Sequence, residues 1–108
     1  MDFLTLEMIK QQCRVEDYSK DPERQRKIDN TLIYCGEKGE EAVYKYIGKN
    51  YAEIIKEYKE VPPPIKHAAL IATYEMTLNE RSPEEHYAFK SILNPYRKIK
   101  PIVEDWLQ

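Results

Sequence analysis

The chain has 108 residues, and its 17 lysines and arginines are outnumbered by 19 aspartates and glutamates, which gives a formal net charge of -2 at pH 7. This length permits one domain with one modest hydrophobic core. Proteins that bind nucleic acid by neutralising phosphates are usually basic, so the net charge argues against that function while leaving room for a local basic patch.

Two cysteines, Cys13 and Cys35, are too few for a disulfide framework, and they do not form a CxxC pair. We interpret them as reduced, partly buried thiols of a cytoplasmic protein, with a disulfide as the alternative. Residues 1–13 lack the basic start and the continuous apolar run of a signal peptide. No apolar stretch approaches the roughly 20 residues of a membrane span, so we expect no membrane partner.

The first part of the chain predicts a short helix, a loop and then a long helix. Thr5 can cap a helix from Leu6 to about Cys13, and residues 14–20 are predicted to form a loop. Asp21 followed by proline is typical of a helix start, and we expect a second helix from Pro22 to about Ile47.

Three glycines punctuate this region. Gly36 and Gly39 interrupt the apolar stripe of the long helix, which predicts either a kink or break near Gly36 or the close approach of another backbone. Gly48 is a good helix terminator, and Asn50 can then cap a third helix from Tyr51 to Tyr58.

The segment VPPPIKHAALIATYEMTLNE at 61–80 begins with three prolines among its first four residues and carries no charge from Ala68 to Tyr74. The prolines stiffen the link and favour entry into a fourth helix. Apolar residues form two rows on this helix, Ile65, Ala69, Ala72 and Met76 in one and Leu70, Tyr74 and Leu78 in the other. Two rows predict contacts on two sides, so we expect both core and subunit contacts here, with Tyr74 and Leu78 as candidate interface residues.

The sequence Ser-Pro-Glu-Glu at 82–85 combines a capping serine, a proline and a capping-box glutamate, and it predicts the start of a fifth helix that ends before Pro95. Residues 95–108 are predicted to form an extended C-terminal arm. Its candidate partner contacts are Tyr96, Arg97, Lys98, Lys100 and Trp106. Alternatively, the arm is a solubilising tail or folds back on its own core.

The sequence therefore predicts a single all-α domain over residues 1–108, built as a compact bundle of four to five helices over about 4–94 with the arm attached. His67 and His86 lie on different predicted helices and lack metal-ligand spacing to cysteines or carboxylates. The adjacent pairs Glu40-Glu41 and Glu84-Glu85 are interpreted as solvated helix faces and helix-start charges. No phosphate-binding loop or nucleophile elbow is present, so we predict no catalytic, cofactor-binding or metal-binding residues and no enzymatic activity.

Four segments carry a family resemblance: LTLEMIKQQCRVE at 4–16, AVYKYIGKNYAEI at 42–54, VPPPIKHAALIATYEMTLNER at 61–81 and SILNPYR at 91–97. In order and spacing they resemble the small head–tail connector proteins of tailed bacteriophages, also called adaptor, DNA-packaging or head-completion proteins. Cys13 stands where leucine is usual in that family, and Ile47 replaces the usual threonine. The tail beyond Arg97 is not part of the family pattern.

The resemblance implies an all-helical structural subunit of the virion, made in the host cytoplasm and placed at the head–tail junction of a phage or prophage. It implies a homo-oligomeric ring of about a dozen copies that docks on the portal protein and offers a surface to a tail-side completion protein. Duplex DNA would pass through the ring without sequence-specific binding, helped by like-charge repulsion. The alternative is a small helical DNA-binding or regulatory module that uses the basic segment Arg97 to Lys100.

Overall fold

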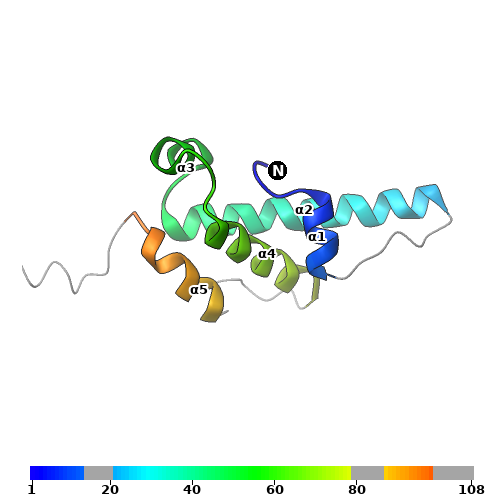
Figure 1. Ribbon diagram of the computed structural model, residues 1–108. Coiled ribbons are helices and arrows are strands. Elements are labelled where there is room, and N and C mark those ends of the chain that lie inside the picture. The colour runs from blue at the N-terminus through cyan, green and yellow to red at the C-terminus, as the bar shows by residue number, and fades with distance from the viewer. Residues whose placement is uncertain (14–20, 79–86, 99–108) are drawn as a thin grey trace, which may run out of the picture.

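Helices account for all the regular secondary structure of residues 1–13, 21–78 and 87–98, the parts of the chain that the computed structural model describes. The all-α prediction is confirmed. The elements, shown in Figure 1, are α1 (Leu6–Cys13), α2 (Pro22–Ile47), α3 (Tyr51–Tyr58), α4 (Pro63–Leu78), α5 (Tyr87–Leu93) and the short 3-10 helix η2 (Asn94–Tyr96).

Local signals set both ends of α2. The side chain of Asp21 accepts a hydrogen bond of 3.0 Å from the backbone N–H of Glu23, and Pro22 occupies the first helical position. At the other end Gly48 adopts a left-handed conformation, with φ of 74°, and donates its N–H to the carbonyl of Tyr44 at 2.9 Å. The 26 residues between form one unbroken helix through Gly36 and Gly39, so the expected break is absent.

A capping box begins α3. The side chain of Asn50 accepts a hydrogen bond from the N–H of Glu53 at 2.8 Å, and the Glu53 carboxylate accepts one from the N–H of Asn50 at 3.3 Å. Lys59 ends the helix in a left-handed conformation and donates its N–H to Ile55. These contacts fix the corner at which the chain turns from α2 through α3 toward α4 (Figure 1).

The centre of the molecule is the packing of α4 along α2, with α1 and α5 also against α4 (Figure 1). Gly39 allows the close approach, because a Cβ atom there would lie 2.8 Å from the carbonyl oxygen of Ala69 and would also overlap the Thr73 hydroxyl. Ala69, Ala72 and Thr73 are completely buried, and Thr73 donates its hydroxyl to the Ala69 carbonyl at 2.8 Å. The sequence predicted either a break in the helix or the close approach of another backbone at the glycines. The structure shows the close approach, at Gly39.

The remaining core surrounds this contact. It is made of apolar residues from all five α-helices and the two linkers before α1 and α4. Its buried members include Leu4, Ile9, Leu32, Val43, Ile47, Ile54, Val61, Ile65, Phe89 and Leu93. Cys13 and Cys35 are both free thiols, the first partly buried and the second buried, and burial raises the pKa of each.

One sequence interpretation is wrong at Glu40. This residue is only 3% exposed, and its carboxylate accepts backbone N–H groups from Asp2 at 2.9 Å, Phe3 at 2.9 Å and Leu4 at 2.8 Å. Glu40 is thus a buried anchor for the N-terminal segment rather than part of a solvated helix face, because a buried carboxylate needs such donors. Its neighbour Glu41 is exposed, as predicted, whereas the pair at 84–85 lies outside the described residues.

The fifth helix is described only from Tyr87, so the predicted capping box at 82–85 lies outside the described residues, as does the predicted loop at 14–20. Phe89 and Leu93 are buried, and α5 passes into η2 at Asn94. Within the described parts of the chain, no helix combines the length and the apolar character that a bilayer crossing requires.

Candidate functional site

Residues 94–98 return to the end of α2 and pack against it. The backbone N–H of Lys98 donates to the carbonyl of Ile47 at 2.7 Å. The guanidinium of Arg97 lies over the Tyr46 ring, 4.8 Å from its centroid, and the Tyr46 hydroxyl donates to the side chain of Asn94 at 2.6 Å. The prediction of an extended arm is therefore wrong for residues 95–98. These residues follow the alternative prediction and fold back on the core.

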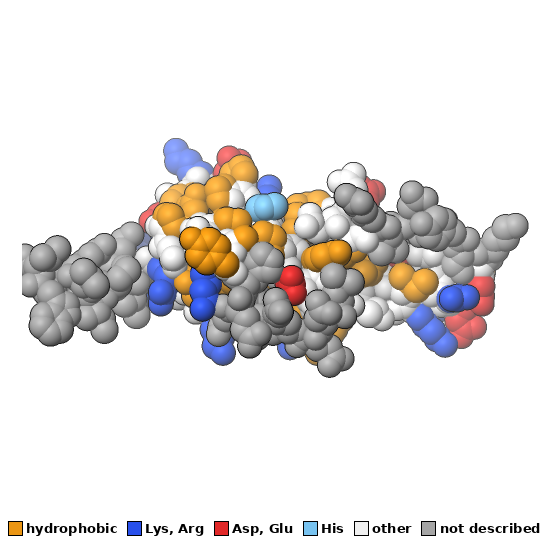
Figure 2. Space-filling model, turned by 90° about the horizontal axis from the view of Figure 1, so that it is seen from below, with side chains coloured by type: hydrophobic (Ala, Val, Ile, Leu, Met, Phe, Trp, Pro, Cys, Tyr) orange, Lys and Arg blue, Asp and Glu red, His pale blue; other side chains and the backbone are white. Residues whose placement is uncertain are grey.

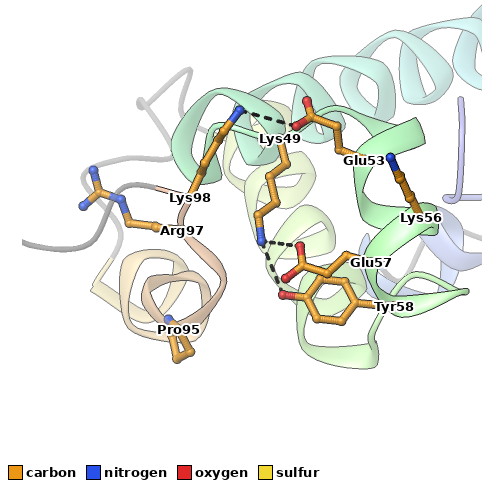
Figure 3. Close-up of a pocket in the computed structure, with 8 residues that line it drawn as sticks. All are labelled: Lys49, Glu53, Lys56, Glu57, Tyr58, Pro95, Arg97 and Lys98. Carbon is orange, nitrogen blue, oxygen red and sulfur yellow. Dashed lines mark hydrogen bonds and ion pairs between the residues drawn. The ribbon is translucent and has the colours of Figure 1, made fainter.

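Packing of this segment creates a hollow at the surface, which we call the corner pocket. It has a volume of about 670 Å³ and lies between α3 and the segment that follows α5 (Figure 3). Most of its lining residues are charged: Lys49, Glu53, Lys56, Glu57, Tyr58, Pro95, Arg97 and Lys98. Four cations and two carboxylates thus meet at one site of a chain whose net charge is negative.

The two carboxylates of the corner pocket are each paired with a lysine. Lys49 extends across the pocket and places its Nζ 2.7 Å from Glu57 and 3.4 Å from the hydroxyl of Tyr58 (Figure 3). Partial burial by itself would lower the pKa of Lys49, but the hydrogen bonds to Glu57 and Tyr58 outweigh it and raise that pKa. From the opposite rim, Lys98 lies 3.5 Å from Glu53.

These pairs leave two cations in surplus. Lys56 and Arg97 lie on opposite sides of the pocket in Figure 3, and neither has a carboxylate partner among the described residues. Lys56 is exposed on α3, while Arg97 is held in place by its contact with Tyr46. Because the Arg97 guanidinium points away from the pocket in Figure 3, the two surplus cations do not converge on one site, and each can form at most a separate ion pair at the surface.

A second surface runs along α4. The helix is apolar around most of its circumference, and its inner side is fully buried at Ile65 and Ala69. Leu70, Ile71 and Tyr74 are only half-buried, and we call these three residues the outer stripe, although Leu70 and Ile71 also pack against the core with part of their surface. Figure 2 shows hydrophobic side chains gathered on the side of the molecule that carries α4 and α5.

The structure brings together only some of the residues that the sequence predicted to contact partners. Tyr96, Arg97 and Lys98 lie at the corner, where the rings of Tyr96 and Tyr58 pack edge-to-face with their centroids 5.8 Å apart. Tyr74 lies about three turns along α4 and does not line the pocket. Leu78 is the last residue of α4, and Lys100 and Trp106 lie outside the described residues.

Sequence reasoning missed Lys49, Lys56 and Glu57 as members of the site. The spacing of lysines and glutamates along α3 was visible in the sequence, but it is equally typical of a solvated helix face. Only the return of residues 94–98 shows that these side chains border a pocket.

His67 does not line the corner pocket. His67 is exposed near the start of α4, and His86 lies outside the described residues. Among the side chains that the structure describes, no group of three or more histidine, cysteine, aspartate or glutamate residues is arranged to hold a metal ion. Comparisons of the chain with protein-family models, with curated proteins and with solved structures find no match.

Proposed function

We propose that the protein is a structural subunit of a homo-oligomeric ring, the head–tail connector of a tailed phage or prophage. In this proposal the ring docks on the portal protein and joins the DNA-filled head to the tail. Two observations support it: the resemblance of four ordered sequence segments to the connector family and, within one of those segments, the distribution of apolar surface on α4.

The apolar surface of α4 carries the proposal. A helix that is hydrophobic on all sides is normally covered on all sides. The inner side of α4 is covered by its own subunit, but Leu70, Ile71 and Tyr74 keep part of their surface open. In a ring of identical subunits, a different surface of the next copy would cover the outer stripe of each subunit, and the same contact would repeat around the ring.

The test is the state of association of the purified protein. We expect sedimentation velocity to show a reversible, concentration-dependent oligomer, and negative-stain microscopy to show closed rings at high concentration or on the portal. The variant Tyr74→Glu should weaken association while circular dichroism remains helical, because Tyr74 is half-buried and a charge there would be desolvated in the interface. The exposed substitution Lys45→Glu on α2 is the matched control.

A protein that stays monomeric at all concentrations and does not bind portal particles would contradict the proposal. Gene neighbourhood gives an independent check, because the proposal expects portal, capsid and tail genes to flank this one.

The corner pocket gives some weight to the alternative, a DNA-binding module that uses the segment from Arg97. Two surplus cations would neutralise about two phosphates, so the slope of log K against log salt would be about -1.8. We therefore expect weak binding to a labelled duplex in fluorescence anisotropy at physiological salt. Tight binding with a much steeper slope would favour the alternative and count against a ring through which DNA slides.

A further inference from the structure

We propose that the apolar hollow between α2 and the end of α4 binds a small amphipathic anion, whose negative group meets Arg24 and Lys27. The inference goes beyond the proposed function, because the hollow lies far along α2 from the corner pocket and its occupation does not require a ring. Three features of the described residues carry it: an apolar lining, a lining without carboxylates, and two neighbouring cations at one end.

The hollow lies where α4 ends beside α2, whose first turns extend past it in Figure 1. Its volume is about 360 Å³, and its apolar lining is Ile28, Leu32, Cys35 and Met76. Leu32 and Cys35 are buried, whereas Ile28 and Met76 keep part of their surface exposed. Sites for small ligands are hollows of roughly 300–1,000 Å³ with a mainly apolar lining and few polar groups, so this hollow has the size and character for a small ligand.

The polar groups of the lining favour a negative ligand. Among the described residues no aspartate or glutamate lines the hollow, although acidic side chains outnumber basic ones in the chain. The hydroxyl of Thr31 already donates to the carbonyl of Lys27 at 3.0 Å. The hydroxyl of Thr77 donates to the carbonyl of Tyr74 at 2.7 Å. The ammonium of Lys27 is therefore the strongest donor left for a ligand in the described lining, and its charge selects an anion.

Arg24 adds a second cation beside the first. It lies three positions before Lys27 and four before Ile28, so the three side chains are neighbours on one side of α2. Both cations are exposed, and neither has a carboxylate partner among the residues that the structure describes. Unlike the surplus cations of the corner pocket, they are close enough to bind one carboxylate together.

Charge and apolar surface are separated along the hollow as they are in an amphiphile. Arg24 and Cys35 are about 16 Å apart along the helix axis, with the cations at the first end and the apolar lining after them. A specific protein partner needs roughly 800 Å² of surface on each side, whereas this pattern occupies about three turns of one helix and the end of another. The observations therefore favour a small carboxylate with a linear apolar chain, for which decanoate is the probe.

The methionines of the full-length protein give a local test, because the chain has 3 of them and only Met76 lines the hollow. We expect the isotope-labelled methyl signal of Met76 in NMR spectra to move in a saturable manner as decanoate is added below its micelle-forming concentration. The signals of Met1 and Met8 should stay in place, and the variant Met76→Leu assigns the third signal. An unmoved Met76 signal would overturn the proposal, and so would equal movement of all three signals, which indicates non-specific association.

Two further ligands test the charge and the apolar chain separately. Decyltrimethylammonium has the same chain and the opposite charge, so it should not move the Met76 signal. Hexanoate should bind more than about tenfold more weakly than decanoate, because each buried methylene group changes the affinity by up to about fourfold. If either ligand binds as tightly as decanoate, the amphipathic site is wrong.

Charge reversal tests the cations themselves. Lys27→Glu should weaken decanoate binding about fivefold. Lys27 is exposed, so the variant should fold, and circular dichroism checks this. Arg26→Glu, an exposed charge reversal at the preceding position that lies on the other side of α2 and does not line the hollow, is the matched control and should leave the affinity unchanged. Equal losses in the two variants would show an effect of net charge alone and would contradict the proposed site.

Discussion

The contact between α2 and α4 and the corner pocket are two regions of one small molecule built on opposite principles. At the helix contact Gly39 meets Ala69 and Thr73, and these groups are sealed from water. At the corner pocket six of the eight lining residues are charged, and two cations remain in surplus. The first region is specified by shape and excludes even one added methyl group, whereas the second is specified by charge and has capacity left for a partner.

This contrast predicts that substitutions in the first region change stability and those in the second change binding. The largest effect is expected for Ala72→Glu, which would place an unpaired charge at a completely buried position of α4. We expect a loss of roughly 3–5 kcal/mol in the free energy of unfolding, a large share of the stability of a domain of this size. Circular dichroism at 222 nm during thermal unfolding measures it.

The matched control is Ala52→Glu, the same substitution at an exposed position in the first turn of α3. A glutamate near a helix N-terminus is favourable, so the free energy of unfolding should hardly change. If Ala72→Glu folds as stably as Ala52→Glu, the contact between α2 and α4 is not the sealed core described above.

A smaller effect is expected for Gly39→Ala. The added Cβ would meet the Ala69 carbonyl, a backbone atom that cannot rotate away, so the helices must separate. We expect a loss of about 1–3 kcal/mol, even though alanine favours the helical conformation more than glycine does. Urea denaturation followed by tyrosine fluorescence or circular dichroism gives the difference.

Gly36→Ala sharpens the same comparison within one helix. A Cβ at Gly36 would meet the ends of the Ile9 and Met1 side chains, which can adjust, so the gain in helix propensity of about 1 kcal/mol should offset most of the overlap. Equal losses at both glycines would show that backbone proximity is not what distinguishes Gly39.

A small loss of stability is also expected at the corner pocket. Arg97→Gln removes the contact with the Tyr46 ring but leaves the backbone bond from Lys98 to Ile47 in place. Because such a partly exposed cation–π contact contributes about 0.5–1 kcal/mol, the free energy of unfolding should fall by no more than that. A loss above 2 kcal/mol in urea denaturation would make the corner a structural element and remove the contrast between the two regions.

Glu40 shares a feature with each of the two regions, because it is charged like the corner pocket and buried like the helix contact. It also shows the limit of reasoning from sequence. A glutamate beside another glutamate on an amphipathic helix predicts a solvated face, and Glu41 behaves in that way. Glu40 instead binds three backbone N–H groups of residues 2–4, which are 36 to 38 positions away in sequence. Glu40 lies four residues after Gly36 and three before Val43, so helical periodicity places it on the buried side of α2, but no local pattern shows that its donors come from the distant N-terminal segment.

The sequence by itself determined where the helices begin and end. Asp21 with Pro22, the left-handed turn at Gly48 and the capping residue Asn50 each satisfy backbone groups within four positions of themselves, so their effect depends on nearby residues alone. For the same reason the bounds of α1, α2 and α3 agree with the sequence prediction.

Only the tertiary structure decided which glycine lies against a backbone, which backbone groups bind Glu40, and that Lys49 and Lys56 share a pocket with Arg97 and Lys98. Each of these facts joins groups that are tens of residues apart. Long-range contacts depend on how the helices pack together, and the periodicity of a single helix shows which side is apolar but not which distant partner covers it.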